Sequence, residues 1–258
     1  MKHIQSCTNP FFKELIKLVG SARQRGKAAQ TLLDGTHLLA AYLDAGKQPQ
    51  HLLLNATALR DAEVTALLER AAGVPVTHLE DKLFAELSEL KTPTGILALI
   101  DLPQPVGMAT DCGFALLLED IQDPGNLGSM LRSAAAAGCD AVFLSSGCAD
   151  AWSPKVLRAA MGGHFVLDIH ERQDLPGVAE AFSDILLATS PQAECSLYDC
   201  DLRGKIAFLF GNEGAGLSDN LLSLATLQIT IPMPGKVESL NAAAATAICL
   251  FEAVRQRL

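Results

Sequence analysis

The sequence predicts an α/β protein in two parts, a smaller α/β domain over residues 1–101 and a larger domain with a parallel sheet over residues 113–258. Three observations support this. Helical and extended patterns alternate along the chain, the strand-like segments after residue 113 are continuous apolar runs, and an aperiodic stretch separates the parts. Continuous apolar strands are typical of parallel sheets that helices cover on both faces.

The first part alternates helical and extended patterns. Asn9 and Pro10 mark the start of the first helix, and Gly46 marks the end of the second. The predicted helices are 9–24, 35–46 and 59–73, and the predicted strands are 51–55, 74–79 and 95–101. Two prolines and two glycines without periodicity follow in DLPQPVGMATDCG and predict a linker, which we place at 102–112.

The second part contains six apolar runs that helical segments separate. The predicted strands are FALLLE (114–119), AVFLSS (141–146), HFVLDI (164–169), DILLAT (184–189), IAFLF (206–210) and LQITIP (227–232). Ligands of such sheets bind beyond the carboxyl ends of the strands. The loops that follow these runs are therefore the places to look for a functional site.

The first such loop opens a helix of small residues, DPGNLGSMLRSAAAAG, in which Asn126 is the expected N-cap. Its polar side chains share one face: Asn126, Ser129, Arg132 and Ser133. An amphipathic helix whose arginine reaches solvent explains this pattern. Alternatively, the free N–H groups of the helix and Arg132 face an anionic or phosphate-bearing ligand.

Two further loops carry polar residues. GNEGAGLS, residues 211–218, has three glycines that allow the backbone to approach a ligand around Glu213, although a tight turn before a helix has similar residues. After residue 232, Ser239 and Asn241 precede an alanine-rich helix. Helix capping accounts for only one of these two side chains.

Charge and cysteine content limit the possible functions. A net charge of −9 argues against a surface that attracts nucleic acid everywhere. The first 27 residues, with six basic side chains against Glu14, are either a solvated helix face or a local basic patch for nucleic acid. The contacts expected in such a patch are Lys13, Arg23, Arg25 and Lys27. Seven scattered cysteines without a Cys-x-x-Cys pair predict reduced thiols and no metal site.

Several classes of protein lack their motifs. No apolar run reaches the roughly 18 residues of a membrane span, and the opening residues lack a signal-peptide core, so we expect a cytoplasmic protein. The Gly-rich fingerprints of NAD-binding and P-loop proteins are missing. None of the six histidines falls in a G-x-S-x-G motif or another nucleophile–base arrangement, which leaves hydrolytic chemistry with little support.

Taken together, the loop motifs resemble the SpoU/TrmH family of RNA ribose 2′-O-methyltransferases. The matching stretches follow the family's order: DPGNLGSMLRSAAAAG, SPKVLRAAMGGHF, LFGNEGAGLS and IPMPGKVESLNAAAATAICLFEA. The first part resembles the substrate-recognition domain that often precedes the catalytic domain and is similar to ribosomal protein L30e, on NPFFKELIKL, LLDGTHLLAAYL and TPTGILALID. Departures are Thr94 and Asp34, where glutamine and glutamate are common, and the alanines after Asn241.

This resemblance implies a deep trefoil knot, a homodimer, and S-adenosylmethionine bound largely through backbone groups. The implied cofactor contacts are Thr189, Gly211, Ile231, Met233 and Leu240. Arg132 would stabilise the attacking ribose oxygen and anchor a phosphate, without a metal. The side chains implied to hold the arginine and the knot loops are Asn126, Glu213, Ser239 and Asn241.

The layout with an L30e-like front domain resembles enzymes that act on the large ribosomal subunit, and this resemblance implies ribosomal RNA rather than transfer RNA as the substrate. Two alternatives stay open, which are a non-catalytic RNA-binding or ribosome-assembly factor on the same fold and an unrelated doubly wound nucleotide enzyme.

Overall fold

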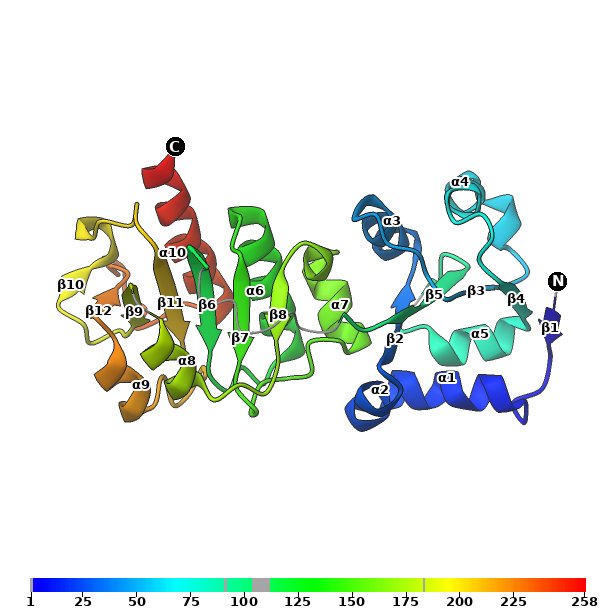
Figure 1. The fold of residues 1–258 in the computed structure, drawn as a ribbon, viewed down its shortest axis with the longest axis horizontal. Helices are drawn as coiled ribbons and strands as arrows, with labels where there is room; N and C mark the ends of the chain where they lie inside the picture. The colour runs from blue at the N-terminus through cyan, green and yellow to red at the C-terminus, as the bar shows by residue number, and fades with distance from the viewer. Residues whose placement is uncertain (1, 91, 104–111, 183) are drawn as a thin grey trace. The chain divides into compact units, whose positions relative to one another are not determined.

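The computed structural model describes residues 2–90, 92–103, 112–182 and 184–258. The described residues up to 103, with Trp152–Phe165, form one compact unit, and those from 112 to Ala151, with Val166–Leu258, form the other. Figure 1 labels their helices and strands. Most of the predicted linker, 102–112, lies outside the described residues.

The first unit is built on a five-stranded mixed sheet with the order β1-β4-β3-β5-β2. Its strands are β1 (Lys2–Ile4), β2 (Gln30–Asp34), β3 (His51–Leu54), β4 (Val76–Leu79) and β5 (Ile96–Asp101). Strands β1, β4 and β3 are parallel, whereas β5 is antiparallel to both neighbours. Its helices before residue 104 are α1 (Pro10–Gly20), α2 (Ala22–Ala28), α3 (Thr36–Asp44), η1 (Ala58–Arg60), α4 (Ala62–Arg70) and α5 (Asp81–Leu87).

The prediction of one helix over 9–24 is wrong. The chain is extended at Ser21, with φ −147° and ψ 117°, and this break separates α1 from α2. Asn9 caps α1 as expected, since its side chain accepts hydrogen bonds from the N–H groups of Phe11 and Phe12. The sequence interpretation also missed β1, β2 and α5.

A segment from the middle of the chain completes the first unit. Helix α7 (Pro154–Ala160) packs against β2, and the Thr31 hydroxyl donates a 2.9 Å hydrogen bond to the carbonyl of Trp152. The ring of Phe165, at the end of the 3₁₀ helix η2 (Gly163–Phe165), meets Tyr42 edge to face. Contacts assign residues 152–165 to the first unit, although they follow residue 113 in the sequence. The predicted domain boundary at residue 113 therefore stays a prediction.

The second unit confirms the predicted parallel sheet. All its strand pairs are parallel, in the order β10-β12-β9-β11-β6-β7-β8. The strands are β6 (Phe114–Leu118), β7 (Ala141–Leu144), β8 (Asp168–His170), β9 (Ile185–Thr189), β10 (Cys195–Ser196), β11 (Ile206–Phe210) and β12 (Leu227–Thr230). The strand expected at 164–169 is displaced, because His164 and Phe165 belong to η2 and are buried in the first unit.

Helices cover both faces of this sheet. Helices α8 (Leu175–Ala181) and α9 (Asp219–Leu224) pack on one face, where Leu117, Leu209 and Leu221 share a core. On the other face, α6 (Pro124–Ala137) and α10 (Ala242–Arg257) lie side by side (Figure 1). The 3₁₀ helix η3 (Leu197–Asp199) follows β10. The trefoil knot rests on the family resemblance and stays an expectation.

Candidate active site

The three loops singled out from the sequence start at the same edge of the parallel sheet. They follow β6, β11 and β12, and β6 and β11 are direct neighbours. Because the strands are parallel, their carboxyl ends share one edge. The sheet therefore brings together segments that are about a hundred residues apart in sequence.

Asn126 connects these loops. Its Nδ2 donates a 2.8 Å hydrogen bond to Oε1 of Glu213, and its Oδ1 accepts a 2.9 Å hydrogen bond from Nδ2 of Asn241. Asn241 in turn accepts from the N–H groups of Ala243 and Ala244 and so caps α10. An amide is suited to this position, because it can donate to a carboxylate and accept from a second amide at the same time.

The expectation that Asn126 caps α6 is wrong. Asp123 is the N-cap, and its carboxylate accepts a 2.7 Å hydrogen bond from the N–H of Asn126. Pro124 occupies the first helical position, where a backbone N–H has no partner within the helix, so the missing N–H of proline costs no hydrogen bond. The Asp-Pro pair was the sequence signal for this cap. Because Asp123 caps the helix, the Asn126 side chain is available to join the loops.

The loop after β11 depends on a close backbone approach. A Cβ on Gly211 would overlap the carbonyl group of Gly216, so only glycine fits there. Asn212 stabilises the turn, since its Oδ1 accepts from the N–H groups of Gly214 and Ala215 and its Nδ2 donates to the carbonyl of Asp120. This rigid turn presents the exposed Glu213 to Asn126.

Glu119 is a residue of this edge that the sequence interpretation missed. Its Oε2 accepts a 2.7 Å hydrogen bond from the N–H of Ser218, which joins the β6 loop to the start of α9. The apolar run FALLLE ends with this carboxylate. Its partner is 99 positions away, so local patterns could not identify the contact.

The segment after β12 has the free polar groups that a ligand would need. Residues 232–240 are in neither helix nor strand, and within the described part of the chain their backbone groups have no hydrogen-bond partner. Val237 and Leu240 are 62% and 39% exposed. Ser239 is also exposed, and its side chain has no hydrogen bond to the described residues.

Arg132 lies on α6 but outside the group of bonded side chains. It is exposed, and no described residue pairs with its guanidinium. The opposite face of α6 is buried through Leu127, Met130 and Leu131. The helix is therefore held by packing, and the arginine is available to an external partner.

The expected cofactor contacts gather at the same edge. Thr189 ends β9, and its hydroxyl donates a 2.9 Å hydrogen bond to the carbonyl of Leu209 on β11. Gly211 follows β11, and Ile231 and Met233 follow β12 with half-buried side chains. Leu240 lies beside the cap of α10. Apolar side chains next to free backbone groups suit a ligand with both an aromatic base and polar substituents.

The basic stretch of the first unit is divided by burial. Lys13, Arg23 and Lys27 are exposed. Arg25 is only 5% exposed, and its Nη1 donates to the carbonyls of Leu18 and Val19 at the end of α1. The expectation that Arg25 contacts RNA is therefore wrong for this structure, since its guanidinium satisfies helix-end carbonyls instead.

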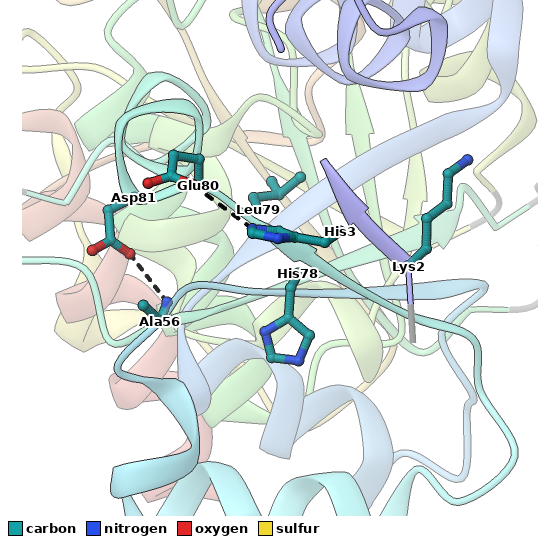
Figure 2. A pocket seen from close by; sticks show the side chains of 7 residues that line it. All are labelled: Lys2, His3, Ala56, His78, Leu79, Glu80 and Asp81. Carbon is teal, nitrogen blue, oxygen red and sulfur yellow. Dashed lines mark hydrogen bonds and ion pairs between the residues drawn. The ribbon is translucent and has the colours of Figure 1, made fainter. Parts of the chain in front are cut away.

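The first unit contains a pocket of about 330 Å³ that the sequence did not indicate. Figure 2 shows the side chains that line it. Its lining residues are Lys2, His3, Ala56, His78, Leu79, Glu80 and Asp81. Glu80 pairs with His3 at 3.8 Å, and Asp81 accepts a 3.0 Å hydrogen bond from the N–H of Ala56. Because acidic and basic groups are mixed in this lining, it does not select a ligand of one charge.

The described residues contain no helix that is long and apolar enough to cross a membrane. They also contain no group of three His, Cys, Asp or Glu side chains placed to hold a metal ion.

Three loops meet at the carboxyl edge of a parallel α/β sheet, and side-chain hydrogen bonds join them. This arrangement is typical of α/β proteins that bind a small molecule at that edge. Comparison with known proteins identifies the family. Residues 113–251 match the SpoU rRNA Methylase family, and residues 9–98 match the MRM3-like substrate binding domain. The chain belongs to the SpoU rRNA methylase family, which confirms the resemblance seen in the sequence.

Similar proteins span almost the whole chain. An uncharacterized tRNA/rRNA methyltransferase of Synechocystis is 37% identical over 98% of this chain and 94% of its own length. The 23S rRNA (guanosine(2553)-2′-O)-methyltransferase RlmP of Bacillus subtilis is 34% identical over 97% of this chain and 98% of its own. The crystal structure of AviRb from Streptomyces viridochromogenes with AdoMet has a TM-score of 0.87 at 28% identity, covering 96% of this chain and 98% of that one.

Proposed function

We propose that this protein transfers a methyl group from S-adenosylmethionine to a ribose 2′-oxygen of ribosomal RNA. The observation that carries the proposal is the hydrogen-bonded group Asn126, Glu213 and Asn241, which joins the three family motifs at one edge of the parallel sheet. The relatives named rRNA methyltransferases support the substrate class.

The residues at this edge fit the cofactor. Free backbone groups of 232–240 can bind its polar substituents, and the side chains of Ile231, Met233 and Leu240 can contact its apolar surface. Thr189 and Gly211 border the same space from β9 and β11. When bound, S-adenosylmethionine supplies a methyl carbon, which the ribose oxygen attacks while the carbon–sulfur bond breaks.

Arg132 has the chemistry that the attacking oxygen needs. Negative charge grows on the ribose 2′-oxygen as its proton leaves, and a nearby guanidinium stabilises that charge. The planar fork of arginine can also bind a neighbouring phosphate with two hydrogen bonds. A guanidinium stays protonated in proteins, so Arg132 is assigned charge stabilisation and phosphate anchoring rather than proton removal.

Asn126, Glu213, Ser239 and Asn241 are positioning residues in this proposal. The bonds of Asn126 fix the loop of Glu213 and the start of α10, which border the proposed cofactor site. Correct positioning of the reactants lowers the barrier of a bimolecular reaction by several kcal/mol, so small shifts of these loops should reduce the rate of methyl transfer.

RNA contact is assigned to the exposed basic residues of the first unit, Lys13, Arg23 and Lys27. We also expect a homodimer in the cytoplasm. Exposed apolar side chains in the segment before α10 and on α10 support a protein interface, since Val237 and Phe251 are 62% and 48% exposed.

The test measures transfer of a labelled methyl group to ribosomal and transfer RNA, followed by nucleoside mass spectrometry. We expect a 2′-O-methyl nucleoside in ribosomal RNA. Label in transfer RNA alone would change the substrate class. Calorimetry with S-adenosylmethionine separates the remaining alternative, because a non-catalytic RNA-binding factor would bind RNA without the cofactor.

A further inference from the structure

Two of the seven thiols lie against each other at the edge of the second sheet. The Sγ atoms of Cys195 and Cys200 are 3.6 Å apart. Both thiols also point at one acceptor, the carbonyl of Ser196, at 3.7 Å and 3.4 Å. A disulfide is about 2.05 Å long, so the two sulfurs need to approach by only about 1.5 Å to be joined.

The local backbone permits this approach. Cys195 belongs to the two-residue strand β10, an edge strand that pairs with β12 and with no other strand among the described residues. Cys200 is fixed more firmly, since its carbonyl accepts a 3.0 Å hydrogen bond from Nε2 of Gln256 on α10. A shift of Cys195 toward Cys200 therefore disturbs few hydrogen bonds.

We propose that Cys195 and Cys200 form a redox-modification site, which closes into an intramolecular disulfide when the protein meets a low-molecular-weight disulfide such as oxidised glutathione. The thiolate of Cys195 attacks one glutathione sulfur and releases one glutathione thiolate. The thiolate of Cys200 then attacks Sγ of Cys195 and releases the second. Two protein thiols are oxidised, one glutathione disulfide is reduced, and the two thiol protons pass to the released glutathiones.

The order of these steps follows from the surroundings of Cys200. Burial, and then Cys195 beside it, raise the pKa of the Cys200 thiol to about 12, so it is the poorer first nucleophile. Once Cys195 is in a mixed disulfide, its sulfur carries no charge and no longer accepts the proton of the Cys200 thiol as a thiolate would. Its contribution to the raised pKa of Cys200 is then removed, which favours the second attack.

Three of the other cysteines, Cys7, Cys139 and Cys249, differ clearly from this pair. Burial raises the pKa values of Cys139 and Cys249 to about 12, and their side chains are almost fully enclosed. Cys7 is exposed and can accept glutathione, but it belongs to the first unit, whereas Cys195 and Cys200 belong to the second. Cys7 therefore serves as an internal control for simple mixed-disulfide formation.

This bond would form beside the proposed cofactor site. Cys195 pairs with Ile229 on β12, and Ile229 pairs with Thr189 on β9, so the three residues form one row across the sheet. The proposal itself depends on the two thiols alone and not on methyl transfer. If the disulfide does not form, the proposed methyl transfer is unaffected. If the protein does not transfer methyl groups, the proposed disulfide is unaffected.

The experiment incubates the full-length protein with oxidised glutathione, blocks remaining thiols with N-ethylmaleimide, and digests with trypsin. The peptide 173–203 contains both thiols and no other cysteine. We expect it to be two hydrogens lighter and unalkylated, and to regain two alkylation sites after dithiothreitol. Cys195→Ser and Cys200→Ser should abolish the lighter peptide, whereas Cys7→Ser should retain it.

Two results would overturn the proposal. One is a wild-type peptide that keeps both alkylation sites while Cys7 is fully glutathionylated. The other is a stable glutathione adduct on Cys195 without the internal bond. Because Cys7 reports whether the oxidant was active, an unmodified pair cannot be attributed to a failed reaction.

Discussion

Nδ2 of Asn241 donates a 2.9 Å hydrogen bond to Oδ1 of Asn126, although the two residues are 115 positions apart. The bond joins the head of α10 to the first turn of α6. Its partner bond to Glu213 makes Asn126 the common member of three loops. The first prediction tests this connection.

Asn126→Asp should reduce S-adenosylmethionine binding by about tenfold or more, because a hydrogen bond to a charged group contributes roughly 1.5–3 kcal/mol. The new carboxylate would face Oε1 of Glu213 without a hydrogen to donate. Calorimetry measures the affinity. Asn220→Asp, on the exposed start of α9, adds the same charge and should bind normally. Equal affinities for the two variants would contradict a positioning role for Asn126.

Arg132→Ala should lower methyl transfer by about 10²–10³-fold, the usual loss when a group that stabilises a developing oxyanion is removed. Arg132→Lys should restore only part of the rate, since lysine keeps the charge but not the planar fork. Labelled methyl transfer measures both.

The thermal unfolding of Arg132→Ala should change little, within about 0.5 kcal/mol, because the side chain is exposed and pairs with no described residue. Arg203→Ala, another exposed arginine of the second unit, should keep full activity. An unchanged rate in Arg132→Ala would remove the arginine from the mechanism.

Gly211→Ala should destabilise the second unit by about 1–3 kcal/mol, because its Cβ would overlap the backbone of Gly216. Gly204→Ala is the matched control, since a Cβ there has no neighbour within 4 Å. Urea unfolding compares the two. A Gly211→Ala protein as stable as Gly204→Ala would show that the turn can relax.

Lys13→Ala and Arg25→Ala should fail in different ways. Lys13→Ala should weaken RNA binding, because an exposed lysine contributes mainly phosphate contacts. The slope of log K for RNA binding against log salt concentration should become smaller by about one, and the free energy of unfolding should not change. Arg25→Ala should lose about 1–3 kcal/mol of stability, since it leaves helix-end carbonyls without a donor. Filter binding at several salt concentrations and urea unfolding separate the effects.

Asp34 should make stability depend on pH. Burial raises the pKa of its carboxyl group. The hydrogen bonds from the Ser88 hydroxyl and from the N–H of Glu89 lower the pKa, but burial has the larger effect. Its Oδ1 is buried and has no hydrogen-bond partner among the described residues. A raised pKa in the folded state favours the protonated form. The stability that this group contributes is therefore present below its ordinary pKa of 3.8 and is lost as the pH rises through the raised value.

Asp34→Asn should therefore be more stable than the wild type at pH 7 and should lose that advantage near pH 3.5. Urea unfolding at both values measures the difference. Asp44→Asn, an exposed carboxylate that pairs with Arg70, should show no such gain at neutral pH. A constant difference between Asp34→Asn and the wild type at both values would exclude this role of Asp34.

The sequence predicted the second sheet well because strands buried on both faces are continuous apolar runs. Strands β6, β7, β9, β11 and β12 all fall within predicted ranges. The two residues of β10 and the three of β1 are too few to show a period. Long-range pairing is the other limit, since local patterns do not reveal the contact between Glu119 and Ser218.

The candidate site shows the same division. The motif residues Asn126, Glu213 and Asn241 were identified from the sequence, but the hydrogen bonds that join them were not. Arg25 was misinterpreted because a basic pattern does not show where the helix breaks. Ser21 caps α2 and Arg25 turns back to the last carbonyls of α1, and a pattern of basic residues shows neither contact.

The assignment of Trp152–Phe165 to the first unit has a practical consequence for dissecting the protein. A fragment that starts at residue 113 would keep α7 but lose β2 and the Tyr42 ring that α7 and Phe165 pack against. Apolar side chains such as Leu157 and Phe165 would then meet water. Such a fragment should aggregate unless this segment is replaced by a short polar bridge, so the methyltransferase half is not a module that a single cut can release.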